Sequence, residues 1–176
     1  MLDKGTPEPT EAIRTIASTH PRWREVALVI LTVFTAYTTA ISWQAQGVSY
    51  PLFRVVGTEG FAAYHQHYNE DILWPVLIPG FPTVFACALF LWIRPVRVPR
   101  PAGAAVTAIG ISSLLLTLLW AIPMHDRLDR DGPVAATIDS LLQANLLRSV
   151  LLTVCTILLG SMVLGTDRPD ARVMDR

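Results

Sequence analysis

The chain has 176 residues, which is enough for one domain, and 52% of them are hydrophobic. Its mean hydropathy of +0.43 is high for a soluble domain. The 14 basic and 14 acidic side chains cancel, which gives no reason to expect a nucleic-acid partner.

Four long segments carry no charged side chain: residues 26–53, 72–93, 101–124 and 149–166. About 20 apolar helical residues cross the hydrocarbon core, and the fourth segment reaches that length when residues 146–148 are added. Backbone polar groups in lipid must pair within their own segment, so these segments should be helices. The sequence therefore predicts an all-α, antiparallel bundle of four transmembrane helices, with spans at about 26–47, 72–93, 102–123 and 141–165.

The basic residues are distributed unevenly along the chain. Most lie in an N-terminal arm (1–24), in the connection 94–100 and in the tail (167–176). The other two connections carry only Arg54, Arg127 and Arg130. By the positive-inside rule, both termini should be cytoplasmic, on either side of a membrane domain at 25–166. We expect an integral protein of a bacterial cytoplasmic membrane.

The second apolar segment contains Pro75, Pro79 and Pro82 around Gly80. Proline removes a backbone donor, so the outer half of this helix should be kinked. Two interpretations stay open. The kink is either a packing irregularity or the wall of a pocket whose neighbouring helices satisfy the freed backbone groups.

The polar stretch 59–73, before the second span, has helical spacing. Phe61, His65 and Tyr68 share one face and His67 lies on the other, so His65 should point inward and His67 into water. Gly132-Pro133 is typical of a helix start, which would place the beginning of the fourth helix well before its apolar part. These extensions predict a small extracytoplasmic cap above the bundle.

Asn145 and Arg148 share a face of the fourth helix. A basic side chain inside the bilayer usually faces the protein interior and finds partners there. Arg148 lies close to the predicted outer end of its span, however, so its side chain can also extend outward to the headgroups. The sequence leaves an interior polar site and an outward-extending side chain as alternatives.

The histidines are candidate acid–base groups or ligands. His65 and His125 belong to connections on the same predicted side of the membrane and are expected to meet. As a pair they are a candidate metal or haem-type ligand set, or acid–base groups, or buried polar groups without such a role. His67 with Glu70 or Asp71 has metal-ligand spacing, but on a solvated face. The sequence identifies no cofactor.

The two cysteines, Cys87 and Cys155, lie deep in different apolar segments and form no Cys-x-x-Cys motif. This pattern favours buried packing residues over a thiol oxidoreductase.

Three short motifs together resemble a large group of small four-helix membrane proteins of unknown function that includes the anthrone oxygenase family. That group shows a Tyr-His pair before the second helix, Pro-x-His-x-x-Leu after the third, and Asn-x-x-Arg in the fourth. The matching residues here are Tyr64, His65, Pro123, His125, Leu128, Asn145 and Arg148.

The resemblance covers about residues 26–165. It implies a four-helix membrane fold and groups His65, His125, Asn145 and Arg148 into one site. The family name implies oxygenation of a polycyclic aromatic. Many relatives carry Trp after the Asn, whereas this chain has Leu146, so any role of that indole is absent.

Three functions follow as hypotheses. The first is a ligand-binding or scaffolding membrane protein with an outward-facing polar pocket. In that pocket Tyr64, Tyr68, Asn145 and Arg148 would bind a lipophilic small molecule. The second is a membrane oxidoreductase or oxygenase-like enzyme for an aromatic or quinone-like substrate, in which His65, His125 and Arg148 would be catalytic. The third is a small transporter, for which four spans without a repeat offer little room. The sequence sets no oligomeric state.

Overall fold

The computed structural model describes residues 22–165, and every regular element in this range is a helix. The predicted all-α class is therefore confirmed. The predicted arm and tail lie outside the described residues except for 22–24, which open the first helix. The elements are α2 (Arg22–Gln44), η1 (Ala45–Ser49), α3 (Tyr50–Leu52), α4 (Thr58–Asp71), η2 (Leu73–Leu77), α5 (Ile78–Ala88), α6 (Phe90–Ile93), α7 (Arg100–Leu116), η3 (Thr117–Ala121), α8 (Ile122–Asp131) and α9 (Ala135–Leu164), where η marks π-helical turns.

Within residues 22–165, three continuous helical stretches are long and apolar enough to cross a membrane: Arg22–Leu52, Arg100–Asp131 and Ala135–Leu164. A fourth crossing exists if α4 and the η2–α5 stretch, which meet at a 43° bend, count as one span. Stretches of 30 to 32 residues measure about 45–48 Å, longer than the ~30 Å hydrocarbon core. Their ends therefore extend beyond the apolar layer. The chain is an integral membrane protein with several membrane-spanning helices.

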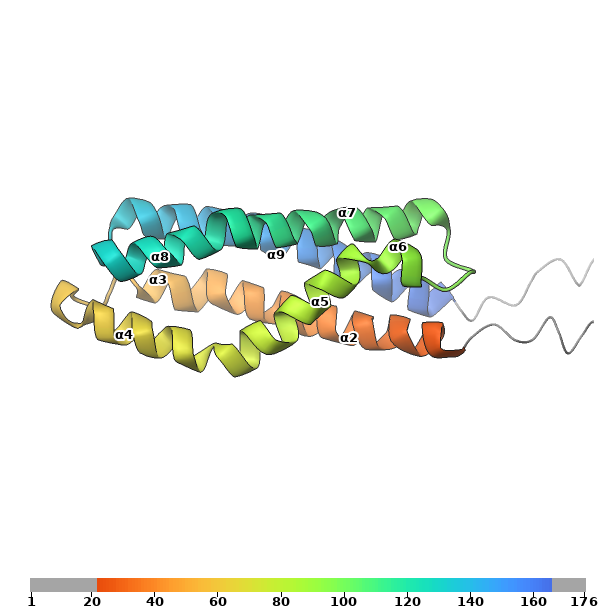
Figure 1. The fold of residues 1–176 in the computed structure, drawn as a ribbon, viewed down its shortest axis with the longest axis horizontal. Coiled ribbons are helices and arrows are strands. Elements are labelled where there is room, and N and C mark those ends of the chain that lie inside the picture. The colour runs from red at the N-terminus through yellow and green to blue at the C-terminus, as the bar shows by residue number, and fades with distance from the viewer. Residues whose placement is uncertain (1–21, 166–176) are drawn as a thin grey trace, which may run out of the picture.

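The long helices lie side by side, and the molecule has two distinct ends (Figure 1). The start of α2, the end of α9 and the turn between α6 and α7 lie together at what we call the termini end (Figure 1). The α4 and α8 helices and the start of α9 lie at the opposite end, which we call the α4/α8 end. Neighbouring stretches run in opposite directions, and α2 packs along α9 while α5 packs along α7.

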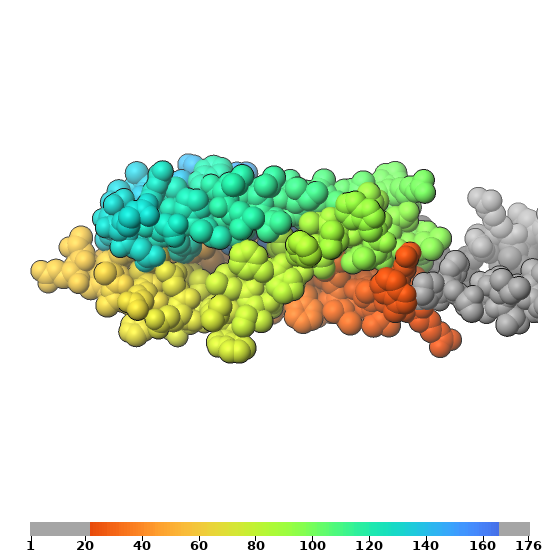
Figure 2. Space-filling model, in the orientation of Figure 1, coloured from red at the N-terminus to blue at the C-terminus, as the bar shows by residue number. Residues whose placement is uncertain are grey.

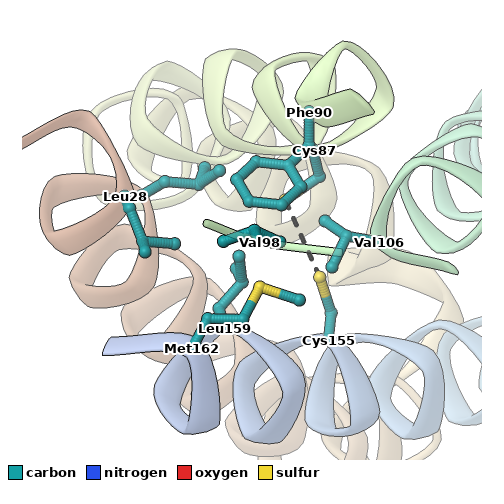
Figure 3. Close-up of a cluster of buried hydrophobic side chains, with 9 residues drawn as sticks. Leu28, Cys87, Phe90, Val98, Val106, Cys155, Leu159 and Met162 are labelled. Atoms are coloured by element: carbon teal, nitrogen blue, oxygen red, sulfur yellow. Dashed lines mark hydrogen bonds between the residues drawn. The ribbon is translucent and has the colours of Figure 1, made fainter. Parts of the chain in front are cut away.

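Each end has its own hydrophobic core. The core at the termini end joins residues from α2, α5, the α6–α7 region and α9 (Figure 3), and its buried members include Leu28, Phe90, Val106, Cys155 and Leu159. The core at the α4/α8 end is rich in aromatic residues, and its fully buried members include Phe53, Phe61, Leu128, Ile138 and Leu141.

The two cysteines meet in the core at the termini end. Both are free and buried, and their Sγ atoms lie 3.8 Å apart (Figure 3). The Oγ1 of Thr35 lies 3.6 Å from the Sγ of Cys87. The sequence predicted buried packing residues in separate segments, and the fold places these two against each other.

Gly110 sets the closest approach of α7 to α5. A Cβ atom built on Gly110 would lie 2.4 Å from the backbone N of Ala88, so no larger residue fits without moving the helices apart. Close by, the helix is interrupted at Leu89 between α5 and α6, and the Oγ1 of Thr107 on α7 accepts a hydrogen bond of 2.9 Å from the backbone N–H of Leu91. Small and polar residues of α7 thus stabilise the interrupted helix.

The kink predicted for the outer half of segment 72–93 lies at the first residue of that segment. It falls at Ile72, between α4 and the π-helical η2, and the helix then continues through Pro82. The N–H groups of Val76 and Leu77 both donate to the carbonyl of Ile72. The bond from Leu77 spans five residues instead of four and widens the helix into a π-helical turn, a common cause of a kink. The fourth helix begins at Ala135, well before its apolar part as predicted, and Gly132, with a φ of +76°, ends α8.

Hydroxyl groups join α2 to α9 between the two cores. Ser42 contacts Ser149 at 2.7 Å and Thr39 contacts Thr156 at 2.9 Å, in each case between hydroxyl oxygens. Ser42, Ser149 and Thr35 are buried. A polar strip thus runs through the middle of the helix pair and leads to the site described next.

Candidate functional site

A cavity of about 290 Å³ lies at the α4/α8 end of the molecule, between α2, the bent η2–α5 stretch, the η3–α8 stretch and α9. In Figure 2 the surface is recessed between the yellow α4 and the teal α8. Most of the lining is apolar and includes Ile41, Ile72, Leu77, Phe81, Val84 and Leu114. The polar lining includes Tyr50, Tyr68, His125, Asp126, Asp129 and Arg148.

Arg148 extends from α9 to the cavity rather than outward. Its Nη2 donates to the Oδ1 of Asn145 at 2.7 Å, and its Nη1 donates to the Oγ1 of Thr117 at 3.3 Å. Its Nε is buried without a hydrogen-bond partner. No carboxylate of residues 22–165 forms an ion pair with this guanidinium. Of the two alternatives left by the sequence, the structure shows the interior polar site.

Asn145 holds Arg148 in place without lining the cavity itself. It is buried, and its Nδ2 donates to the backbone carbonyl of Ser42 at 3.0 Å and to the Oε1 of Gln46 at 2.9 Å. Its Oδ1 is therefore directed at Arg148. All polar atoms of the amide are satisfied, which fixes the position of the guanidinium.

His65 and His125 lie together, as their topology predicted. The Nε2 of His65 and the Nδ1 of His125 are 3.1 Å apart, and the rings stack with centroids 5.3 Å apart. His65 is fully buried, whereas His125 lines the cavity. On the cavity side, the Nε2 of His125 lies 3.5 Å from the hydroxyl of Tyr50.

Sequence reasoning missed Asp129. Its Oδ1 lies 2.5 Å from the Nδ1 of His65, and its side chain is 47% exposed. The residue occupies the position four after His125 on α8, so the two share a helix face. That spacing was visible in the sequence, but only the packing of α4 against α8 shows which histidine the carboxylate reaches.

The two predicted tyrosines have different surroundings. Tyr68 lines the cavity and stacks against His125 at 6.3 Å between ring centroids. Tyr64 lies outside the cavity lining and packs edge-on against Phe53. His67 is exposed on the opposite face of α4, as predicted, with its Nδ1 3.9 Å from Glu70.

The residues that the structure describes contain no group of three or more His, Cys, Asp and Glu side chains arranged to hold a metal ion. His65 and His125, the pair suggested as ligands, are hydrogen-bonded to each other. Their arrangement is that of a hydrogen-bonded chain from Asp129 to the cavity.

The chain was compared with known proteins on the basis of its sequence and its fold. It matches no family model, no curated protein and no solved structure.

Proposed function

We propose that this protein binds a lipophilic small molecule within the membrane, with an oxygen atom of the ligand at Arg148. The observation that carries the proposal is a guanidinium that has no carboxylate partner among residues 22–165, at a cavity that is otherwise mainly apolar. Small-molecule sites commonly combine apolar walls with a few fixed polar groups. The cavity volume of about 290 Å³ suits a ligand of roughly two fused rings.

The ligand's polar group should be a carboxylate, a phenolate or a carbonyl oxygen. Arginine only donates hydrogen bonds, so it selects acceptors, and an anionic oxygen gives the stronger charge-assisted bond. The apolar part of the ligand would lie against Leu77, Phe81 and Leu114. Asn145 supports this arrangement because it keeps the guanidinium from turning away.

The membrane arrangement is part of the proposal. The helices form a four-span antiparallel bundle with both termini in the cytoplasm, and the α4/α8 end forms an extracytoplasmic cap around the cavity mouth. The support is the concentration of basic residues in the arm 1–24, the connection 94–100 and the tail 167–176, together with the combined length and apolarity of α4 and the η2–α5 stretch. The cavity then opens toward the outer face.

The test is binding of labelled 2-naphthoate and of 1,4-naphthoquinone to the purified protein in lipid nanodiscs. Saturable binding of one molecule per chain is expected for at least one probe. Arg148→Met should weaken it by about 10-fold or more, since a hydrogen bond to a charged group contributes about 1.5–3 kcal/mol. Arg100→Met, on the exposed start of α7, is the matched control. Equal binding by Arg148→Met, or no saturable binding of either probe, contradicts the proposal.

A second candidate is an oxygenase-like or other oxidoreductase acting on the bound molecule. One observation favours it: His125 lines the same cavity as Arg148, so an acid–base group and an anion-binding group can reach one ligand. The resemblance to the group that includes the anthrone oxygenase family points the same way. The test is turnover of a naphthol or an anthrone by the nanodisc protein, with product analysis, against His125→Gln.

A further inference from the structure

The geometry points to a proton relay in which Asp129 and His65 act through His125 to exchange a proton between water and the cavity. The inference rests on the proposed ligand site and adds an activity to it. The chain of contacts runs from the Oδ1 of Asp129 to the Nδ1 of His65 (2.5 Å), and from the Nε2 of His65 to the Nδ1 of His125 (3.1 Å). It ends at the Nε2 of His125, beside the hydroxyl of Tyr50.

The carboxylate fixes the direction of every hydrogen bond in this chain. A carboxylate only accepts, so the Nδ1 of His65 must carry the proton. Asn69 also approaches this nitrogen, at 3.4 Å, but the carboxylate is much closer. In neutral His65 the Nε2 is then an acceptor, which requires a proton on the Nδ1 of His125. The Nε2 of His125 then carries no proton, and its lone pair is available at the cavity, where the hydroxyl of Tyr50 can donate to it at 3.5 Å until a ligand takes its place.

That lone pair can accept a proton from a bound ligand. As the bond to the Nε2 of His125 forms, the Nδ1 proton of His125 passes to the Nε2 of His65. The imidazolium formed on His65 lies against the carboxylate of Asp129, which stabilises its charge. Asp129 is half exposed, so the proton leaves to water there, and the ligand anion remains beside Arg148. The ligand loses one proton and water gains one.

Burial makes the pathway specific. His65 is fully buried, so among the described residues its exchange of protons with water passes through Asp129 or His125. His125 is surrounded by other titratable or charged groups, which are His65 and Tyr68 from α4, Tyr50 from α3, Asp126 and Asp129 from α8, and Arg148 from α9. Only Asp129 of the two aspartates contacts His65. His65 and Asp129 are therefore positioning residues for His125.

The relay is tested by the tautomer of His125, measured by nitrogen NMR of histidine-labelled protein without ligand. The chain has four histidines, so single variants assign the signals. The native protein should show the proton on the Nδ1 of His125 and none on its Nε2. In Asp129→Asn the side-chain amide can donate to the Nδ1 of His65, which should move the proton of His125 to Nε2. The matched control is Asp126→Asn, which makes the same charge change on the same helix and should keep the native tautomer.

A second variant keeps the test decisive if the amide introduced by Asp129→Asn presents its oxygen to His65. His65→Phe preserves the stacked ring but removes both nitrogens, so His125 should lose its fixed Nδ1 proton and show a mixture of tautomers. The relay is wrong if His125 keeps the native tautomer in both variants, or if Asp126→Asn shifts it as strongly as Asp129→Asn. Binding of 2-naphthoate and 1,4-naphthoquinone, measured on the same samples, is an independent readout. Retained probe binding with an unmoved tautomer overturns the relay alone.

Discussion

Arg148 and Asn145 show how a charged side chain is held inside an apolar bundle. Among the residues that the structure describes, the guanidinium has two hydrogen-bond acceptors, and neither is a carboxylate. A charged group at such a depth is costly unless it is hydrogen-bonded, and these contacts supply part of that stabilisation. The Nε of Arg148 has no hydrogen-bond partner among residues 22–165, and the side chain lines the cavity.

At the residue scale we predict that Asn145→Ala destabilises the protein. The substitution removes the acceptor of Arg148 and leaves the carbonyl of Ser42 without its side-chain donor. The expected loss is about 1–2 kcal/mol in the free energy of unfolding. Unfolding of the detergent-solubilised protein by a denaturing detergent measures it. The control is Gln143→Ala, exposed on the same helix, and an equal loss in both variants would contradict the assigned role.

At the element scale the second span is the least regular of the helices. It bends at Ile72, contains a π-helical turn and is interrupted again at Leu89. Neighbouring helices compensate at both places. The hydroxyl of Tyr37 on α2 donates to the carbonyl of Pro75 at 2.8 Å. Beside the second interruption, the hydroxyl of Thr107 on α7 accepts a hydrogen bond from the N–H of Leu91. The bend moves η2 outward and leaves room for the cavity.

Tyr37→Phe should loosen this bend. It removes the hydrogen bond to Pro75 and costs about 0.5–1.5 kcal/mol. The effect should be local, with faster amide hydrogen exchange at Val76 and Leu77 as measured by mass spectrometry. Tyr64→Phe is the matched control, because the structure shows ring packing for Tyr64 but no hydrogen bond from its hydroxyl within residues 22–165. Unchanged exchange in Tyr37→Phe would argue against the compensating role.

Gly110→Ala should destabilise the contact between α5 and α7. The added Cβ would meet the backbone of Cys87 and Ala88, which cannot move without separating the helices. Overpacking of this kind costs about 1–3 kcal/mol. Gly160→Ala is the control, since no heavy atom lies within 4 Å of its Cβ position, and it should be neutral or slightly stabilising. Thermal unfolding of the two variants measures the difference.

The sequence predicted these elements better than their irregularities. Charge-free segments revealed the long helices because the bilayer imposes length and apolarity on them. The inward face of α4 followed from helical spacing, which places Phe61 and His65 together. The exact position of the bend did not follow, because three prolines in that half each remove a backbone donor and the sequence does not rank them. The link from His65 to Asp129 was also missed, since it depends on how two separate helices are packed.

At the scale of the whole molecule, the proposed orientation can be tested by cysteine labelling. Glu59→Cys on α4 and Arg100→Cys on α7 place an exposed thiol at opposite ends. A membrane-impermeant maleimide added to intact cells should label the first variant and reach the second only after permeabilisation. The native cysteines are buried and give little background. The reverse pattern would place the cavity mouth in the cytoplasm.

The two ends of the molecule differ in how firmly they are closed. At the termini end, Arg97 forms a bidentate ion pair with Glu25 of α2 and also donates to the carbonyl of Met162 on α9, next to the core that contains the cysteines. The cavity at the other end is bounded by α8, which continues the α7 helix without a break, and by α4, which is set off by residues 53–57 and by the bend at Ile72. We therefore expect a molecule that enters the cavity to displace α4 more readily than α8 or the termini end. For the proposed ligand site, α4 would then be the movable wall of the cavity and the continuous helices its fixed frame.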